Sequence, residues 1–294
     1  LLSLGGRLDH WRNFDASQAT LPLRSGANRT EVEFADREEI AFSPRASILY
    51  QATPNLTFSI SGYRAYRAPT LNELYRSFRV GDVLTQANED LLAERLSGGE
   101  VGALYTTFNR RLTARGTFFW SEITRPIANV TLSVVPGLIT RQRQNLGRTR
   151  SRGIEAETEF RLNSHWQLSA GYLYTDAVVT RFPTNISLEG LLIPQTPRHQ
   201  FTTQLFYSNP SLWSFGVQSR ASGIQFDDDQ NRLALNRYFT LDLFASRHIT
   251  EQIEAFVAAE NLFNSRYEIG KTPVATIASP ISVRVGFRFN FGSR

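Results

Sequence analysis

The sequence predicts an all-β protein, an antiparallel transmembrane β-barrel of about 12 strands. Apolar and polar residues alternate with a period of two along most of the chain. The connections between the alternating runs are short and long in turn. No apolar run approaches the ~20 residues that a membrane-spanning helix needs, whereas a barrel strand needs only about 9–11 residues with one apolar face.

The last segment shows the alternation most clearly. Successive side chains of a strand point to opposite faces, so this segment has one apolar and one polar face. The apolar face holds Ile281, Val283, Val285, Phe287, Phe289 and Phe291, and the polar face holds Ser282, Arg284, Gly286, Arg288 and Asn290. Similar runs surround Phe58, Ile154, Trp213 and Phe239. In the run that begins at Phe239, Phe244 departs from the pattern by falling on the polar face.

Predicted turns and loops separate the predicted strands. Short turns of two or three residues, most with Asn, Pro or Ser, lie at 53–55, 109–111, 163–165, 209–211 and 250–252. Long connections occupy 13–37, 67–96, 125–139, 179–197, 224–236 and 263–280. The predicted strands are 3–12, 38–52, 56–66, 97–108, 111–124, 140–162, 166–178, 199–208, 212–223, 237–248, 252–261 and 281–291.

A lipid bilayer explains this pattern. Hydrocarbon cannot satisfy backbone N–H and C=O groups, so a spanning sheet must pair its strands, with an apolar side toward lipid and a polar side toward the lumen. Short turns then face the periplasm and long loops the outside, which makes 281–291 run toward the periplasm. A soluble β-sandwich also alternates, but it rarely combines long strands with turns that are short on one side only.

Composition excludes several classes of function. With no Cys there is no disulfide framework, cysteine-ligated zinc or thiol nucleophile. The four His, at 10, 165, 199 and 248, form no metal pair, and the two beside predicted periplasmic turns offer no pocket for Ser-His-Asp catalysis. We therefore expect no enzyme activity and no cofactor. The Arg residues that dominate the basic set are spread along the chain, so nucleic-acid binding is not expected.

Motifs in the long connections carry a family resemblance. Tyr66-Arg67-Ala68-Pro69 leaves a predicted strand, Thr70 and Glu73 form a predicted capping box, and Asn88-Glu89-Asp90-Leu91 follows. Further on come Asn145-Leu146-Gly147, Gly153-Ile154-Glu155 and Glu260-Asn261-Leu262-Phe263-Asn264, with an aromatic residue, Phe291, near the end. In this order they resemble the TonB-dependent outer-membrane receptor family. Glu89 and Asp90 depart from its Asn-Pro-Asn-Leu segment, and Gly292 to Arg294 extend beyond its terminal aromatic residue.

The resemblance implies a 22-stranded barrel plugged by an N-terminal domain, in the bacterial outer membrane. Ligand would bind from outside, and an inner-membrane TonB complex would supply energy through the plug. The sequence has no Met and begins at Leu1, so we interpret residues 1–294 as the C-terminal portion of such a barrel, with the plug domain and first strands absent. The expected partners are outer-membrane lipid, the TonB complex and a small chelate or other scarce nutrient.

Two groups of loop residues are candidates for ligand contact. The first is Tyr66, Arg67, Ala68 and Pro69, with Tyr75 and Asn88; the alternative is that this segment ends a strand and orders a loop. The second is Asp227, Asp228 and Asp229, whose carboxylates could hold Ca²⁺; because the spacing lacks an EF-hand pattern, a solvated turn is the favoured interpretation.

The polar faces supply a third group, which we expect to line the lumen, to form cross-strand ion pairs or to face the plug. It comprises Glu155, Glu157, Glu159, Asp242, Glu260, Arg284 and Arg288.

An iron–siderophore complex is the favoured substrate by analogy with the family, while cobalamin, nickel chelates and oligosaccharides remain open. Haem is disfavoured because 70–96 contains no His. One alternative is a self-contained 12-stranded barrel, such as an autotransporter translocator or an outer-membrane lipase, and another is a soluble carbohydrate-binding β-protein. The first alternative requires a ring closed between 3–12 and 281–291, whereas a fragment of a larger barrel should form an open, curved sheet.

Overall fold

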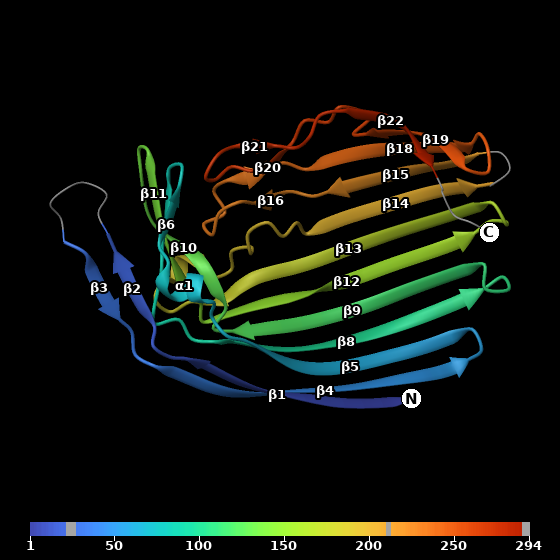
Figure 1. Ribbon diagram of the computed structural model, residues 1–294. Helices are drawn as coiled ribbons and strands as arrows, with labels where there is room; N and C mark the ends of the chain where they lie inside the picture. The colour runs from blue at the N-terminus through green and yellow to red at the C-terminus, as the bar shows by residue number, and fades with distance from the viewer. Residues whose placement is uncertain (22–27, 210–212, 290–294) are drawn as a thin grey trace.

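The computed structural model describes residues 1–21, 28–209 and 213–289, and one antiparallel sheet of twelve strands dominates it (Figure 1). Each strand of the sheet pairs with the next one of the set along the chain. In order they are β1 (Leu2–Asn13), β4 (Arg37–Thr53), β5 (Leu56–Arg67), β8 (Glu94–Thr107), β9 (Leu112–Thr124), β12 (Arg148–Arg161), β13 (Trp166–Arg181), β14 (His199–Ser208), β15 (Ser214–Ser222), β18 (Tyr238–His248), β19 (Ile253–Glu260) and β22 (Ser282–Phe289).

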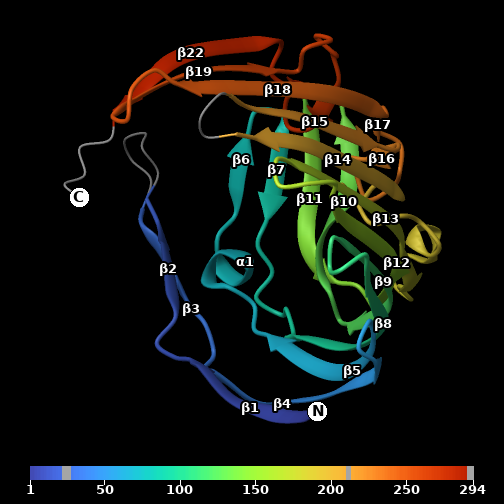
Figure 2. The ribbon, with the colours of Figure 1, turned by 90° about the vertical axis from the view of Figure 1, so that its right-hand side faces the viewer.

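The sheet is an open arc. Figure 2, viewed along the strands, shows it curving from β1 to β22 with a gap between these two. β1 pairs with β4 and β22 pairs with β19, and within the described ranges no register joins β1 to β22. The open half-barrel expected from the sequence is confirmed. The closed ring required by a self-contained 12-stranded barrel is not formed.

Short turns gather at one end of the arc and long connections at the other (Figure 1). The long connections contain small sheets that alternation did not predict. These are β2 (Ser17–Thr20) with β3 (Thr30–Glu33), β6 (Phe78–Val80) and β7 (Val83–Gln86) with β10 (Ile127–Val135) and β11 (Leu138–Asn145), β16 (Gln225–Phe226) with β17 (Ala234–Leu235), and β20 (Glu268–Gly270) with β21 (Thr276–Ile277). Two short helices accompany them, α1 (Leu71–Tyr75) and the 3₁₀ helix η1 (Ile186–Leu188).

One predicted strand, 140–162, is wrong. β11 ends at Asn145 and β12 begins at Arg148, and the two belong to different sheets. The chain turns at Gly147, where an added Cβ would lie 2.7 Å from the carbonyl oxygen of Arg181, so only glycine fits this close approach. The alternation continued through the turn because both flanking segments are extended.

The apolar face of the sheet is its exposed outer surface. Val285 is 75% exposed, Phe287 62%, Trp213 50% and Phe58 43%, so none of these packs in a globular core. The predicted apolar face is therefore confirmed for the part of the chain that the structure describes. Phe291 and the turn residues Pro210 and Ser211 lie outside that part.

Aromatic side chains mark the short-turn end of this face. Trp166, Tyr207 and Phe215, from three adjacent strands, pack with ring centroids 5.0–5.3 Å apart. The guanidinium of Arg247 lies 5.0 Å from the ring centroid of Trp213. Aromatic rings of this kind form the belts of membrane proteins at the boundary between lipid and water. Within the described ranges, no helix has the length and apolar character to cross a membrane.

Replacing Val101 by Arg tests the lipid face. Val101 pairs with Ile60 near the middle of β5 and β8, and both side chains are exposed. An Arg on the lipid face near the midplane should lower the free energy of unfolding by about 2–4 kcal/mol. Reversible denaturant unfolding of the full-length protein in lipid vesicles measures this loss. Gln218→Arg, on the polar face, is the matched control and should change stability little; equal effects of the two substitutions would contradict the assignment.

Candidate ligand-binding site among the long loops

The long connections fold over the concave side of the sheet (Figure 2), and residues of both line a cavity of about 750 Å³. Thr149, Ile123 and Val179 of the large sheet line its base, so the odd-numbered residues of β12 face inward. Its walls come from β10, β11 and the segments 188–195 and 227–233. The apolar wall contains Val130, Val134, Ile139, Leu188, Leu192 and Ile193, and the polar groups include Arg141, Gln195, Asp227, Asp228, Asp229 and Thr272.

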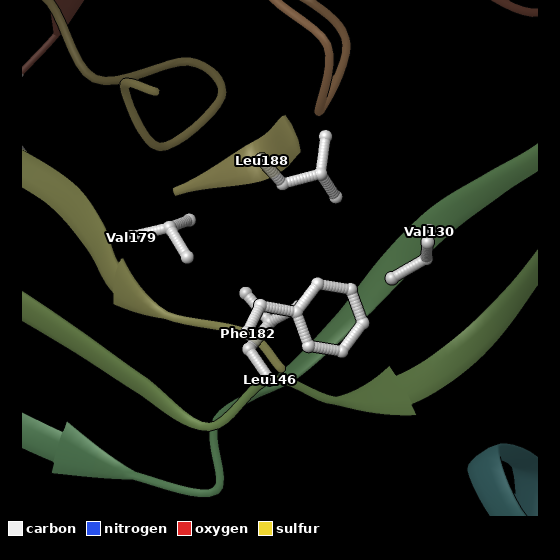
Figure 3. Close-up of a cluster of buried hydrophobic side chains, with 5 residues drawn as sticks. All are labelled: Val130, Leu146, Val179, Phe182 and Leu188. Atoms are coloured by element: carbon white, nitrogen blue, oxygen red, sulfur yellow. The ribbon is translucent and has the colours of Figure 1, made fainter. Parts of the chain in front are cut away.

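A small hydrophobic core fixes one wall of this cavity (Figure 3). Val130, Leu146, Val179, Phe182 and Leu188 are all buried, and they come from two different long connections and from β13. The loops thus contain a hydrophobic core of their own. The apolar residues on the outward face of the sheet are exposed and contribute no buried packing. This packing makes the cavity a preformed feature of the loops.

Arg141 projects into the cavity from β11. Its Nε donates a hydrogen bond of 2.9 Å to Oγ1 of Thr85, a fully buried residue on β7. Among the described residues, no carboxylate lies within ion-pairing distance of its guanidinium. Burial lowers the pKa of Arg141, and the carboxylates of Asp227 and Asp229 partly oppose that shift. A guanidinium is nevertheless always charged in proteins, so a half-buried positive charge faces the cavity.

The three consecutive aspartates each bind a different part of the loops. Asp227 accepts hydrogen bonds from Nε2 of Gln195 and from the backbone N–H groups of Lys271 and Thr272, at 2.7–2.9 Å. Asp229 accepts from the N–H and the hydroxyl of Thr131, at 2.9 and 2.6 Å.

Asp228 accepts from the N–H groups of Arg232 and Leu233 and so shapes its own turn. All three aspartates are half-buried, so the run forms a hydrogen-bonded turn that is only partly exposed to solvent. Within the described ranges, no group of three acidic, His or Cys residues is arranged to hold a metal ion.

Asparagines make the other loop junctions. Asn231 has a positive φ of 54° and pairs with the backbone of Leu192 through both side-chain atoms, at 2.8 and 2.9 Å. Asn145 bonds both backbone groups of Leu92 and the carbonyl of Arg125. Asn261 bonds the backbone of Ser265 and Ser279. An amide side chain offers both a donor and an acceptor, so it can replace a missing strand neighbour.

The Tyr66 to Pro69 segment forms the junction between β5 and the next loop. Arg67 binds Glu94 at 2.6 Å and Glu73 at 3.0 Å, and Glu94 also accepts the N–H of Ile127 at 2.6 Å. Thr70 and Glu73 form the capping box of α1. One guanidinium therefore joins the end of β5, helix α1, the start of β8 and the start of β10.

The remaining candidates of this group make similar contacts. The Tyr66 ring lies 4.6 Å from the guanidinium of Arg95, and Ala68 and Pro69 link β5 to α1. Tyr75 Oη accepts from Asn13 at 2.6 Å. Asn88 donates to the carbonyl of Arg143 at 2.9 Å. None of these residues lines the cavity, so their contact with ligand stays a prediction.

The charged residues of the polar faces lie on the side of the sheet opposite the exposed apolar residues. Arg284 pairs with Glu260, Arg288 with Glu254 at 2.6 Å, and Arg115 with Glu157 at 3.7 Å. Asp242 accepts the N–H of Asn261 at 2.8 Å. Glu155 and Glu159 share the side of β12 that carries Thr149 at the base of the cavity. That this face lines a plugged lumen stays a prediction.

Sequence reasoning missed Arg141 and Gln195. Arg141 was assigned to a lipid-facing strand, although Arg141, Gln142, Arg143 and Gln144 are polar on both faces. A run without an apolar face cannot border lipid, and this signal could have placed it among the loops. Nothing in the local sequence marks Gln195, because its contact with Asp227 joins loops 32 residues apart.

Comparison with known proteins agrees with this architecture. The family described as "TonB dependent receptor-like, beta-barrel" matches residues 1–262. The chain belongs to the TonB-dependent receptor family. This family consists of transport receptors, and both it and the barrel fold place the chain in the bacterial outer membrane.

Individual relatives cover most of the chain. It is 24% identical over 275 residues to a probable TonB-dependent receptor, BfrD, of Bordetella pertussis, covering 90% of this chain and 35% of that protein. It is 24% identical over 274 residues to the metal-pseudopaline receptor CntO of Pseudomonas aeruginosa, covering 90% and 34%. The siderophore receptor PiuA of Acinetobacter baumannii superposes with a TM-score of 0.75 at 19% identity, covering 98% of this chain and 40% of that one. The chain thus spans about a third of the length of these curated relatives.

Arg67→Gln separates the two interpretations of the Tyr66 to Pro69 segment. If Arg67 orders the loops, amide hydrogen exchange should speed up by roughly tenfold at Glu73 and Ile127, because the charge-assisted bonds that hold these elements are lost. Arg64→Gln, on the same strand, is the control. Unchanged exchange with weaker ligand binding would instead favour direct contact.

Asp227 makes the loop junction sensitive to acid. Burial alone would raise the pKa of Asp227, but hydrogen bonds from Gln195, Lys271 and Thr272 favour the carboxylate and hold that pKa below its usual range. The stabilisation is therefore present above the ordinary Asp pKa of about 3.9 and is lost as the pH falls through the lower, folded-state value. We expect the Lys271 and Thr272 amides to stay protected from exchange at pH 5 and to lose protection only as the pH falls below the ordinary Asp pKa of about 3.9.

Asp227→Asn provides the test of this assignment. It should raise exchange at these amides at pH 5 and abolish the acid-dependent step, since Asn does not titrate. Asp82→Ala, in an exposed turn, is the control. Persistence of the step in Asp227→Asn would show that another group causes it.

Proposed function

We propose that residues 1–294 form the C-terminal arc of an outer-membrane receptor that takes up a small anionic metal chelate, with a ferric siderophore as the favoured substrate. The plug domain and the first strands would lie upstream. The TonB complex would supply energy through that plug. The proposal agrees with the coverage of 40% of the PiuA chain by this twelve-stranded arc.

The observation that carries the proposal is the loop cavity with Arg141 in its wall. A volume of about 750 Å³ is in the range of small-molecule sites, and an apolar wall with a few polar groups is their usual composition. The carboxylates of Asp227 and Asp229 accept hydrogen bonds from the loops, whereas the guanidinium of Arg141 has a neutral hydroxyl as its partner. An anionic ligand would complete this arrangement through a charge-assisted bond.

The names of the relatives supply independent support. One curated relative is a metal-pseudopaline receptor and one solved neighbour is a siderophore receptor. Both names refer to metal chelates. The proposal transfers this ligand class, rather than either individual ligand, to the present chain.

Substitution of Arg141 tests the proposal in the purified full-length receptor. Binding of anionic ferric catecholates, neutral ferric hydroxamates and cobalamin would be measured by quenching of tryptophan fluorescence. Arg141→Gln should weaken binding of the anionic chelate by roughly 10- to 100-fold, since one charge-assisted hydrogen bond contributes about 1.5–3 kcal/mol. Arg141→Lys should retain part of the affinity.

Arg115→Gln removes a guanidinium from the polar face of the sheet, away from the cavity, and is the control. Wild-type affinity in Arg141→Gln would reject the role of this residue. Failure of the wild-type receptor to bind any ferric chelate, together with undiminished growth of a deletion strain under iron limitation, would reject the substrate class.

A further inference from the structure

A cluster of arginines lies on the outward face of the sheet, away from the cavity. Arg148, Arg150 and Arg152 occupy alternate positions at the start of β12, at the end of the sheet that carries the long loops. Thr149, between the first two, lines the cavity on the concave side. The three arginines therefore share the opposite face with Ile154, which is 51% exposed.

One carboxylate holds most of this cluster. Asp176 of β13 lies 3.4 Å from Arg150, 3.2 Å from Arg152 and 3.7 Å from Arg198, while Arg148 pairs with Glu122 at 3.1 Å. Four guanidinium groups thus share two carboxylates, which leaves an excess of two positive charges. Arg152 and Arg198 are each about half exposed, so their remaining N–H groups are accessible.

The cluster begins where the apolar band ends. On β13 the outward residues run from Trp166 through Leu168 and Ala170 to Tyr172 and Tyr174, and Asp176 follows. Trp166 to Tyr174 is nine residues, within the about 9–11 residues that a tilted barrel strand needs to cross the bilayer. Trp120 pairs with Arg152, and Tyr172 Oη lies 2.8 Å from Nδ1 of His199. These aromatic residues mark the lipid boundary at the loop end, as Trp166 does at the other end.

The position and the positive charge of the arginine cluster together indicate which kind of molecule would bind to it. Guanidinium groups bind phosphate through paired hydrogen bonds, and arginines just beyond an aromatic belt lie at the level of lipid headgroups. The loop end of the barrel faces outward, toward the outer leaflet. We propose that Arg150, Arg152 and Arg198 form a binding site for the phosphate groups of a phosphorylated glycolipid of that leaflet, held in geometry by Asp176.

Asp176 has a positioning role in this site. It lies among the three guanidinium groups and is largely buried, with a side-chain exposure of 14%. Its charge offsets part of their mutual repulsion, while the exposed edges of Arg152 and Arg198 stay free to bind. The site is independent of the transported ligand, because it faces lipid and the cavity lies on the other side of the sheet.

Native mass spectrometry of the delipidated, full-length receptor tests the proposal. The probes are a bisphosphorylated lipid A, its dephosphorylated form and inorganic phosphate. We expect the wild type to retain the bisphosphorylated lipid. A triple variant, Arg150→Gln, Arg152→Gln and Arg198→Gln, should bind it at least tenfold more weakly, and the corresponding triple Lys variant should recover part of the binding.

The matched control removes three arginines from the opposite end of the barrel: Arg110→Gln, Arg111→Gln and Arg161→Gln. It should bind lipid A like the wild type. Equal binding by the cluster variant, equal loss in the control, or equal retention of the dephosphorylated lipid would each overturn the proposal. Displacement of lipid A by millimolar inorganic phosphate would also overturn it, since it would indicate a site for free anions.

If the triple Gln variant does not fold, the single substitution Arg198→Gln decides. Arg198 precedes β14 and lies outside the large sheet, so its loss should leave the barrel intact. A weaker lipid A adduct supports the site, and an unchanged one rejects it. Ferric-chelate binding, measured in parallel, should be unaffected in every cluster variant, which separates this outcome from failure of the proposed transport function.

Discussion

The inability of hydrocarbon to form hydrogen bonds is the constraint on which this structure depends. Backbone groups in lipid must pair within the protein, so the chain forms long antiparallel strands with continuous registers. Because lipid surrounds the sheet, the distribution of side chains is also the reverse of that in a water-soluble protein. Large apolar residues such as Val285 and Phe287 are exposed on the outer face, and ion pairs such as Arg288 with Glu254 lie on the opposite face. The ion pairs of Asp176 lie on the outer face, at the end of the sheet that carries the long loops. Buried apolar packing is consequently concentrated in the loops, around Phe182 and Leu188.

This constraint also explains how far sequence reasoning could reach. A strand between lipid and a polar interior has a strict period of two, so eleven of the twelve predicted segments coincide with single strands of the large sheet, to within a few residues at each end. The remaining one, 140–162, merged β11 with β12 because extended segments on both sides of Gly147 preserve the period. Loops outside the bilayer face no comparable restriction. Their small sheets depend on long-range contacts that leave no local pattern.

The candidate site shows the same division. The sequence marks Asp227, Asp228 and Asp229 as unusual, but a run of three carboxylates does not reveal that the first and third bind separate segments while the second shapes its own turn. The family motifs predict the family correctly. In the structure, most contacts of the motif residues join one segment of the loops to another. Arg67, Asn145 and Asn261 join backbone segments that the barrel itself does not connect. Arg141, by contrast, belongs to no motif, and its proposed role rests on its burial beside a neutral hydroxyl.

The aspartate run has a consequence for how such receptors diversify. Its hydrogen bonds fasten residues 195, 131 and 271–272 to one short turn, and Asn231 adds a fourth attachment at Leu192. A change in the length of one of these segments shifts the anchor of the others. Exchanging a single segment between relatives would therefore break contacts in its neighbours, whereas exchanging the whole interlocked set would preserve them. If these segments contact the ligand as proposed, they would change together during evolution, and their residues are expected to covary.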